Sequence, residues 1–131
     1  MTIIREELKA RLPAESPAAA LLASARAMLR AYDEKAPFFL TIENAIRSNT
    51  GLSARKEKMI ADLADDVREI LTTPAGATSL SRIAAEALAG TVFALVRATI
   101  GGWVEAKATI PILDLFDEAA SVVQLEAKIC R

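Results

Sequence analysis

Few residue types in this chain could carry catalysis or hold a metal ion. Histidine is absent from all 131 residues, which removes the commonest general base and transition-metal ligand. The single cysteine, Cys130, has no second cysteine with which to form an internal disulfide. Gly101 and Gly102 lie inside a helical pattern rather than after a strand, so they do not predict a phosphate-binding loop. We therefore expect no catalytic residues, no metal site and no cofactor.

A group of four carboxylates has the composition of a metal site. Its members are Asp62, Asp65, Asp66 and Glu69. Basic residues alternate with them at helical pairing distance, as in Lys58–Asp62 and Asp65–Arg68. We favour a solvated charged face with internal ion pairs over a metal site. Three further charges, Arg82, Glu86 and Arg97, interrupt the most apolar segment, where an exposed helix edge is favoured over a cavity lining.

The large flexible and aromatic side chains suggest a different kind of site. Most of them belong to one set: Met28, Tyr32, Phe38, Phe39, Ile42 and Trp103. Ordinary core packing is one explanation, because such residues fill the interior of most domains. The other is a mostly apolar ligand pocket between helices, with Tyr32 as its polar group. We keep both alternatives and take these residues as the candidate ligand-binding set.

The elements that would position these residues are all helices. Hydrophobic residues make up 53% of the chain, yet Gly 5 and Pro 5 are too few for many tight turns. Apolar residues recur at helical spacing and never settle into alternating runs. The pattern predicts an all-α bundle with helices at about residues 2–12, 17–34, 37–48, 54–72, 79–106 and 111–129. Residues 49–51 predict a turn, Ser53 a cap for the fourth helix, and Thr109 with Pro111 the start of the last.

The segment 79–106 organises the predicted bundle, because it has two weakly polar faces. One face carries large residues, including Val92, Leu95 and Trp103. The neighbouring face carries small ones at helical spacing: Gly90, Ala94 and Ala98. The large face must meet the core. The small face permits close backbone approach, either within the monomer or across the axis of a symmetric dimer.

Charge and hydropathy argue against several further classes of function. The chain carries 16 basic and 17 acidic residues, a net charge of −1, and no basic patch typical of a nucleic-acid binder. The N-terminus lacks the features of a signal peptide. Charged residues and glycines interrupt the apolar run 83–104, so we expect no membrane span. A cytoplasmic protein is the expectation that follows.

Four stretches in this order resemble a known family. They are AYDEKAPFFLTIENAIRSN at 31–49, KEKMIADLADDVREIL at 56–71, RIAAEALAGTVFALVRATIGGWVEA at 82–106 and PILDLFDEAASVVQLEAK at 111–128. A long Ala/Gly-rich helix ending near a Trp and followed by a Leu-Phe-Asp-type helix is the best-matching part. The chain resembles the C-terminal effector-binding and dimerisation domain of TetR/AcrR-family transcriptional regulators.

The resemblance implies a single all-helical domain over residues 1–131 that forms a homodimer through its last two long helices. The implied dimer-interface residues are Gly90, Ala94, Ala98, Gly101, Phe116, Ala119 and Val123. It also implies a small hydrophobic effector between the middle helices. The helix-turn-helix domain of such repressors has no counterpart in this sequence, so no direct contact with nucleic acid is expected. A structural dimerisation or protein-interaction module without a ligand is the alternative.

Overall fold

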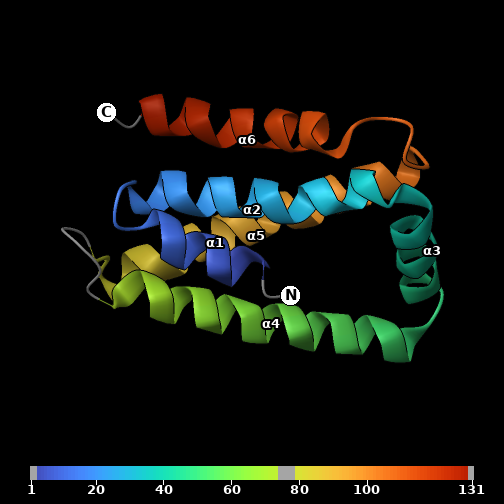
Figure 1. Ribbon diagram of the computed structural model, residues 1–131, viewed down its shortest axis with the longest axis horizontal. Helices are drawn as coiled ribbons and strands as arrows, with labels where there is room; N and C mark the ends of the chain where they lie inside the picture. The colour runs from blue at the N-terminus through green and yellow to red at the C-terminus, as the bar shows by residue number, and fades with distance from the viewer. Residues whose placement is uncertain (1–2, 74–78, 130–131) are drawn as a thin grey trace.

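Six helices account for nearly all of the residues that the structure describes. The computed structural model describes residues 3–73 and 79–129, with side chains placed as far as Val123. The helices are α1 (Ile3–Arg11), α2 (Pro17–Glu34), α3 (Ala36–Arg47), α4 (Thr50–Thr72), α5 (Arg82–Glu105) and α6 (Ile112–Ile129). In Figure 1, α2 and α5 run opposite to α4 and α6, and α3 crosses one end. The described residues contain no strand, which confirms the predicted all-α antiparallel bundle.

Local signals fix where several helices begin. The Ser16 side chain accepts a hydrogen bond from the backbone N–H of Ala19, and Pro17 occupies the first turn of α2. α2 therefore has the predicted bounds. Ser81 caps α5 in the same way by accepting from the N–H of Ala84.

The start of α4 differs from the prediction. Residues 49–51 do not form a separate turn, because the Asn49 side chain accepts a hydrogen bond from the Leu52 N–H and caps a helix that starts at Thr50. Ser53, the predicted cap, instead donates its hydroxyl to the carbonyl of Ile46 at 2.7 Å. The bond from Ser53 ties the first turn of α4 to the end of α3.

The start of α6 depends on a residue from another helix. The Thr109 hydroxyl donates backwards to the Ala106 carbonyl, so it does not cap α6 as predicted. The carboxylate of Asp33, at the end of α2, accepts from the Ile112 N–H at 2.8 Å. Its other oxygen accepts from the Trp103 indole N–H at 3.1 Å. One carboxylate therefore joins α2, α5 and α6.

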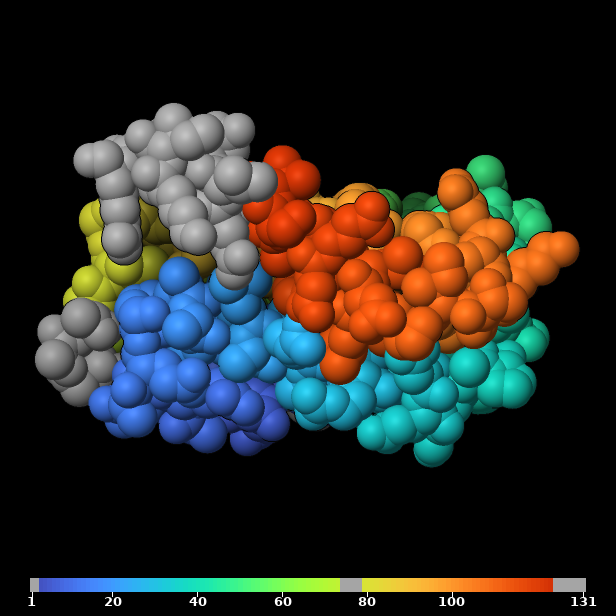
Figure 2. Space-filling view, turned by 90° about the horizontal axis from the view of Figure 1, so that it is seen from above, coloured from blue at the N-terminus to red at the C-terminus, as the bar shows by residue number. Residues whose placement is uncertain are grey.

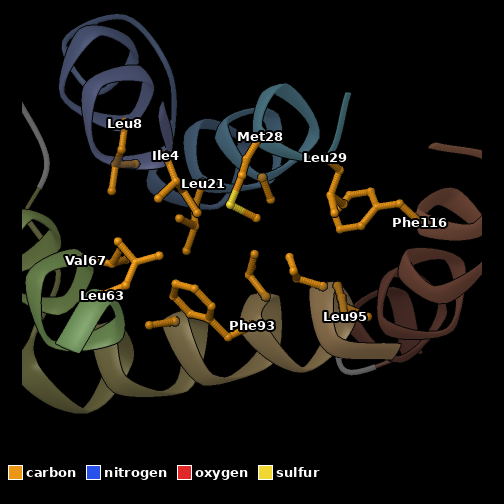
Figure 3. Packing of buried hydrophobic residues seen from close by; sticks show 14 of the residues in the cluster. Ile4, Leu8, Leu21, Met28, Leu29, Leu63, Val67, Phe93, Leu95 and Phe116 are labelled. Atoms are coloured by element: carbon orange, nitrogen blue, oxygen red, sulfur yellow. The ribbon is translucent and has the colours of Figure 1, made fainter. Parts of the chain in front are cut away.

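The core is one cluster of buried side chains around α5. Figure 3 shows residues of α1, α2, α4, α5 and α6 meeting there, among them Leu8, Met28 and Phe93. Trp103 and Phe116 are its largest fully buried side chains. Complete burial of a large apolar side chain contributes about 1.5–3 kcal/mol, so this cluster is the main source of stability. Figure 2 shows the described part of α6 lying beside α2 on this face of the molecule.

The two faces of α5 have different environments, as predicted. The large face is buried, whereas Glu86, Gly90, Ala94, Arg97 and Ala98 are exposed. By length and composition alone, α5 is apolar enough to cross a membrane, although 44% of its most apolar window is buried inside the bundle. The core helix of a soluble domain has the same composition, so this finding does not replace the core role of α5.

Candidate functional site

The helix α3 departs from an ordinary amphipathic pattern at a few positions, although its Phe39 and Leu40 pack against the core. Phe38 is 58% exposed and Ile42 37% exposed, whereas Glu43 is only 4% exposed. Glu43 is also the buried residue of this helix. Large apolar side chains in water and a carboxylate in the interior both oppose folding. The end of the bundle that α3 covers is therefore the place to look for a binding site.

A lysine compensates the buried charge of Glu43. The Lys56 ammonium of α4 lies 2.6 Å from a Glu43 carboxylate oxygen, and the two side chains are 21% and 6% exposed. An ion pair is what a carboxylate needs at that depth, because an isolated charge would be strongly disfavoured. The pair also fixes α3 against the first half of α4.

Tyr32 of α2 completes a buried polar cluster with this pair. Its side chain is almost fully buried, stacks on Phe39 with a centroid distance of 4.5 Å, and meets Trp103 edge-on at 5.6 Å. Burial raises the pKa of the Tyr32 phenol well above its ordinary value, and the neighbouring Glu43 carboxylate raises it further. Tyr32 therefore stays neutral and able to donate a hydrogen bond.

A groove of about 430 Å³ opens where α2, α3 and α4 meet. We call it the α3–α4 groove. Its exposed wall is almost entirely apolar, and charged residues stand among the lining side chains. The lining residues are Tyr32, Phe39, Ile42, Glu43, Ala45, Ile46, Leu52, Arg55, Lys56 and Met59. Its volume lies in the usual range for small-molecule sites, about 300–1,000 Å³.

The groove does not continue into a large interior cavity. Behind Tyr32, Lys56 and Met59 the core leaves a void of only about 40 Å³, which Met28 also lines. Such a volume holds about one or two water molecules. A ligand of drug size would therefore lie in the open groove unless the flexible methionine side chains moved.

The structure separates the predicted ligand-binding residues. Tyr32, Phe39 and Ile42 line the α3–α4 groove together. Met28 lines the small void, and Phe38 faces solvent outside the hollows found in the described residues. Trp103 is fully buried and reaches the groove only through its contact with Tyr32. Its burial in the core replaces the expectation that it borders a pocket.

Sequence reasoning missed the charged half of the groove. It did not single out Glu43, Arg55 or Lys56 as site residues, nor Met59, which is 45% exposed. The sequence contains one signal for this group. Glu43 directly follows Ile42, so on a helix it lies next to the apolar stripe and not opposite it.

The other charged groups identified from the sequence are paired on the surface. Arg5 binds Asp66 at 2.9 Å, and Lys58–Asp62 and Arg68–Asp65 are the two predicted helical pairs. Glu86 pairs with Arg68, and Arg97 with Glu57 at 2.7 Å. Asp62, Asp65, Asp66 and Glu86 therefore lie in exposed ion pairs, as interpreted from the sequence. Arg97 is exposed and paired as well, but it also lines the small void. Within the described residues, no group of acidic side chains could hold a metal ion.

The predicted dimer residues divide between surface and interior. Gly90, Ala94, Ala98 and Val123 are exposed, and Ala119 is half-buried. Phe116 is not on the surface: it is 1% exposed and packs near Leu29 in the core. Gly101 lies under the end of α3, where Arg47 donates to its carbonyl at 3.4 Å.

Gly90 begins the stripe of small residues on the exposed face of α5. Among the residues whose side chains the structure places, none has a heavy atom within 4 Å of a methyl group built on Gly90. Packing against those residues therefore does not explain this glycine. On α6, Ala119 and Val122 follow Leu115 at helical spacing, and Leu115 lies 3.8 Å from a methyl group built on Gly102 of α5. We call Gly90, Ala94, Ala98, Ala119 and Val122 the α5–α6 face.

Comparison of the chain with protein-family models, with curated proteins and with solved structures gives no match. The functional interpretation therefore depends on the groove and on the α5–α6 face.

Proposed function

We propose that this chain is a ligand-sensing and homodimerisation domain of a TetR-like transcriptional regulator. Its effector would be a small, mostly apolar molecule bound in the α3–α4 groove. The observation that supports this most directly is a local departure from the pattern of α3, where Ile42 is exposed and Glu43 is buried beside a groove of about 430 Å³. A local conflict between pattern and fold is typical of functional sites.

The second part of the proposal is a dimer formed by the α5–α6 face. A helix face made of alanine and glycine lets two backbones approach closely, and a symmetric dimer would place it against its own copy. The exposed Val122, with 62% of its surface accessible, would be covered in the same contact. Four helices, α5 and α6 from each subunit, would then form the interface.

Signal transfer from the groove would use α4. Its first half lines the groove through Lys56 and Met59, and its second half binds α1 through the Arg5–Asp66 ion pair. In the family that this chain resembles, the helix corresponding to α1 follows the DNA-binding domain. A ligand would shift the position of α1 only by its difference in affinity between the two arrangements.

A thermal-shift screen of apolar compounds tests the sensor. We expect some compounds to raise the melting temperature of wild type and of Ile110→Asp, whose parent residue is 41% exposed in the connection between α5 and α6. The same compounds should fail with Ile42→Asp, because a carboxylate in the groove would have to be desolvated on binding. A complete lack of response by wild type would contradict the proposal.

A ligand-free dimerisation module is the second candidate, and the filled core favours it. The interior void of about 40 Å³ offers no enclosed pocket. This candidate predicts a dimer in light scattering whose melting temperature no compound changes. A monomer at micromolar concentration would contradict both candidates.

A further inference from the structure

The charges in the α3–α4 groove do not balance. Three charged residues line it, namely Glu43, Arg55 and Lys56. Glu43 and Lys56 neutralise each other at 2.6 Å. Arg55 is exposed and has no ion-pair partner among the residues whose side chains the structure places. The groove therefore presents one uncompensated positive charge beside an apolar wall.

The beginning of α4 supplies no negative charge to offset Arg55. Arg55 lies in the second turn of α4, and the first turn contains no acidic residue. Leu52 and Met59 lie within one turn on either side of Arg55 and line the same groove. A guanidinium flanked by exposed apolar side chains matches a molecule with an anionic end and an apolar body.

We propose that the groove selects an amphipathic carboxylate, with its apolar body on Ile42, Leu52 and Met59 and its carboxylate on Arg55. This proposal rests on the proposed sensor function and names the chemical class of the effector. A guanidinium presents parallel N–H donors that fit the oxygens of a carboxylate. A groove of about 430 Å³ accommodates a small molecule rather than a folded partner.

The other charge classes fit less well. A cation would be repelled by Arg55, and Glu43 offers it little because that carboxylate is already paired and 6% exposed. A dianion such as a phosphate monoester would bring a second negative charge close to Glu43 with no free cation to balance it. A monoanion matches the single unpaired guanidinium.

Calorimetric titration with three matched probes tests the assignment. Decanoate, decanol and decyltrimethylammonium share an apolar chain and differ in their head groups. We expect decanoate to bind wild type about tenfold or more tightly than decanol, as a charge-assisted hydrogen bond predicts. Arg55→Gln should abolish that preference by weakening decanoate binding far more than decanol binding. The matched control is Arg30→Gln, which removes an exposed arginine of α2 that does not line the groove.

The outcomes separate this assignment from the sensor itself. Equal binding of decanoate and decanol, or tighter binding of the cation, would overturn the carboxylate assignment and leave an apolar sensor standing. A decanoate preference that survives in Arg55→Gln would overturn the role of Arg55. If none of the three probes binds, and no compound in the thermal-shift screen changes the melting temperature, the sensor proposal is overturned as well.

Discussion

Two exposed apolar surfaces of this chain differ in side-chain size and in shape. The α5–α6 face is built around alanine and glycine, and the described residues leave open space above Gly90. The α3–α4 groove is lined by large side chains such as Ile42 and Met59, and an ion pair lies at its edge. Small side chains admit another backbone, whereas a hollow between large ones admits a small molecule. The difference suggests that the two surfaces have different partners.

The largest expected effect comes from blocking the α5–α6 face. We expect Ala94→Arg to raise the dimer dissociation constant at least about 100-fold, or about 3 kcal/mol, because a bulky charge would be desolvated between two helices. Size-exclusion chromatography with light scattering measures the change. Ala61→Arg, at an exposed alanine of α4 outside the face, is the control and should remain dimeric. Dimerisation of Ala94→Arg with wild-type affinity would show that this face is not the interface.

The next effect concerns the ion pair of the groove. Lys56→Met should lower the free energy of unfolding by about 2–4 kcal/mol, because it leaves the Glu43 carboxylate buried without a partner. Glu43→Leu combined with Lys56→Met should recover most of that loss, since both charges are then gone. Urea unfolding measures both variants. A double variant as unstable as Lys56→Met would show that lost packing, not the unpaired charge, causes the effect.

A smaller effect should appear in alkaline solution. Because burial and Glu43 raise the pKa of Tyr32, the unfolded chain releases this proton first, near its ordinary pKa of about 10. Stability from this group is complete below about pH 10 and falls above it by up to about 1.4 kcal/mol per pH unit. Tyr32→Phe should show a shallower decline in urea unfolding. Tyr32 is the single tyrosine, so tyrosinate absorbance of the folded protein at about pH 10 would contradict the raised pKa.

The smallest effect distinguishes a functional glycine from an incidental one. Gly90→Ala should stabilise the isolated subunit by up to about 1 kcal/mol, because alanine favours the helix and the added methyl group meets no atom of the side chains that the structure places. The same change should weaken dimerisation, since it separates the two backbones. Urea unfolding in an Ala94→Arg background and light scattering of Gly90→Ala measure the two effects. Unchanged self-association would show that Gly90 is not part of a close contact.

The fold was predictable where local residues decide it. Ser16 and Pro17 specify the start of α2 because a cap and a first-turn proline act within a few residues. The start of α4 was missed because Asn49 followed by Thr50 and Gly51 is equally typical of a turn. The neighbouring segments, not the local residues, decide between a turn and a capped helix there.

The candidate site was predictable only in part. Its aromatic half was predictable, since Tyr32 and Phe39 belong to one conspicuous group. The Glu43–Lys56 pair depends on how α3 packs across the beginning of α4, and the exposure of Phe38 depends on which side of α3 faces the bundle. Both are tertiary properties that helical periodicity does not contain. The same holds for Asp33, which joins three helices although its position in α2 suggests a solvated residue.

The edge-on contact of Tyr32 with Trp103 gives the chain an optical reporter of its own. Trp103 is the single tryptophan, its indole lies 5.6 Å from the Tyr32 ring, and Tyr32 forms the inner wall of the groove. The emission of an indole depends on the groups around it. A molecule that displaces the Tyr32 ring should therefore change tryptophan emission without any attached dye, while Asp33 holds the indole in place.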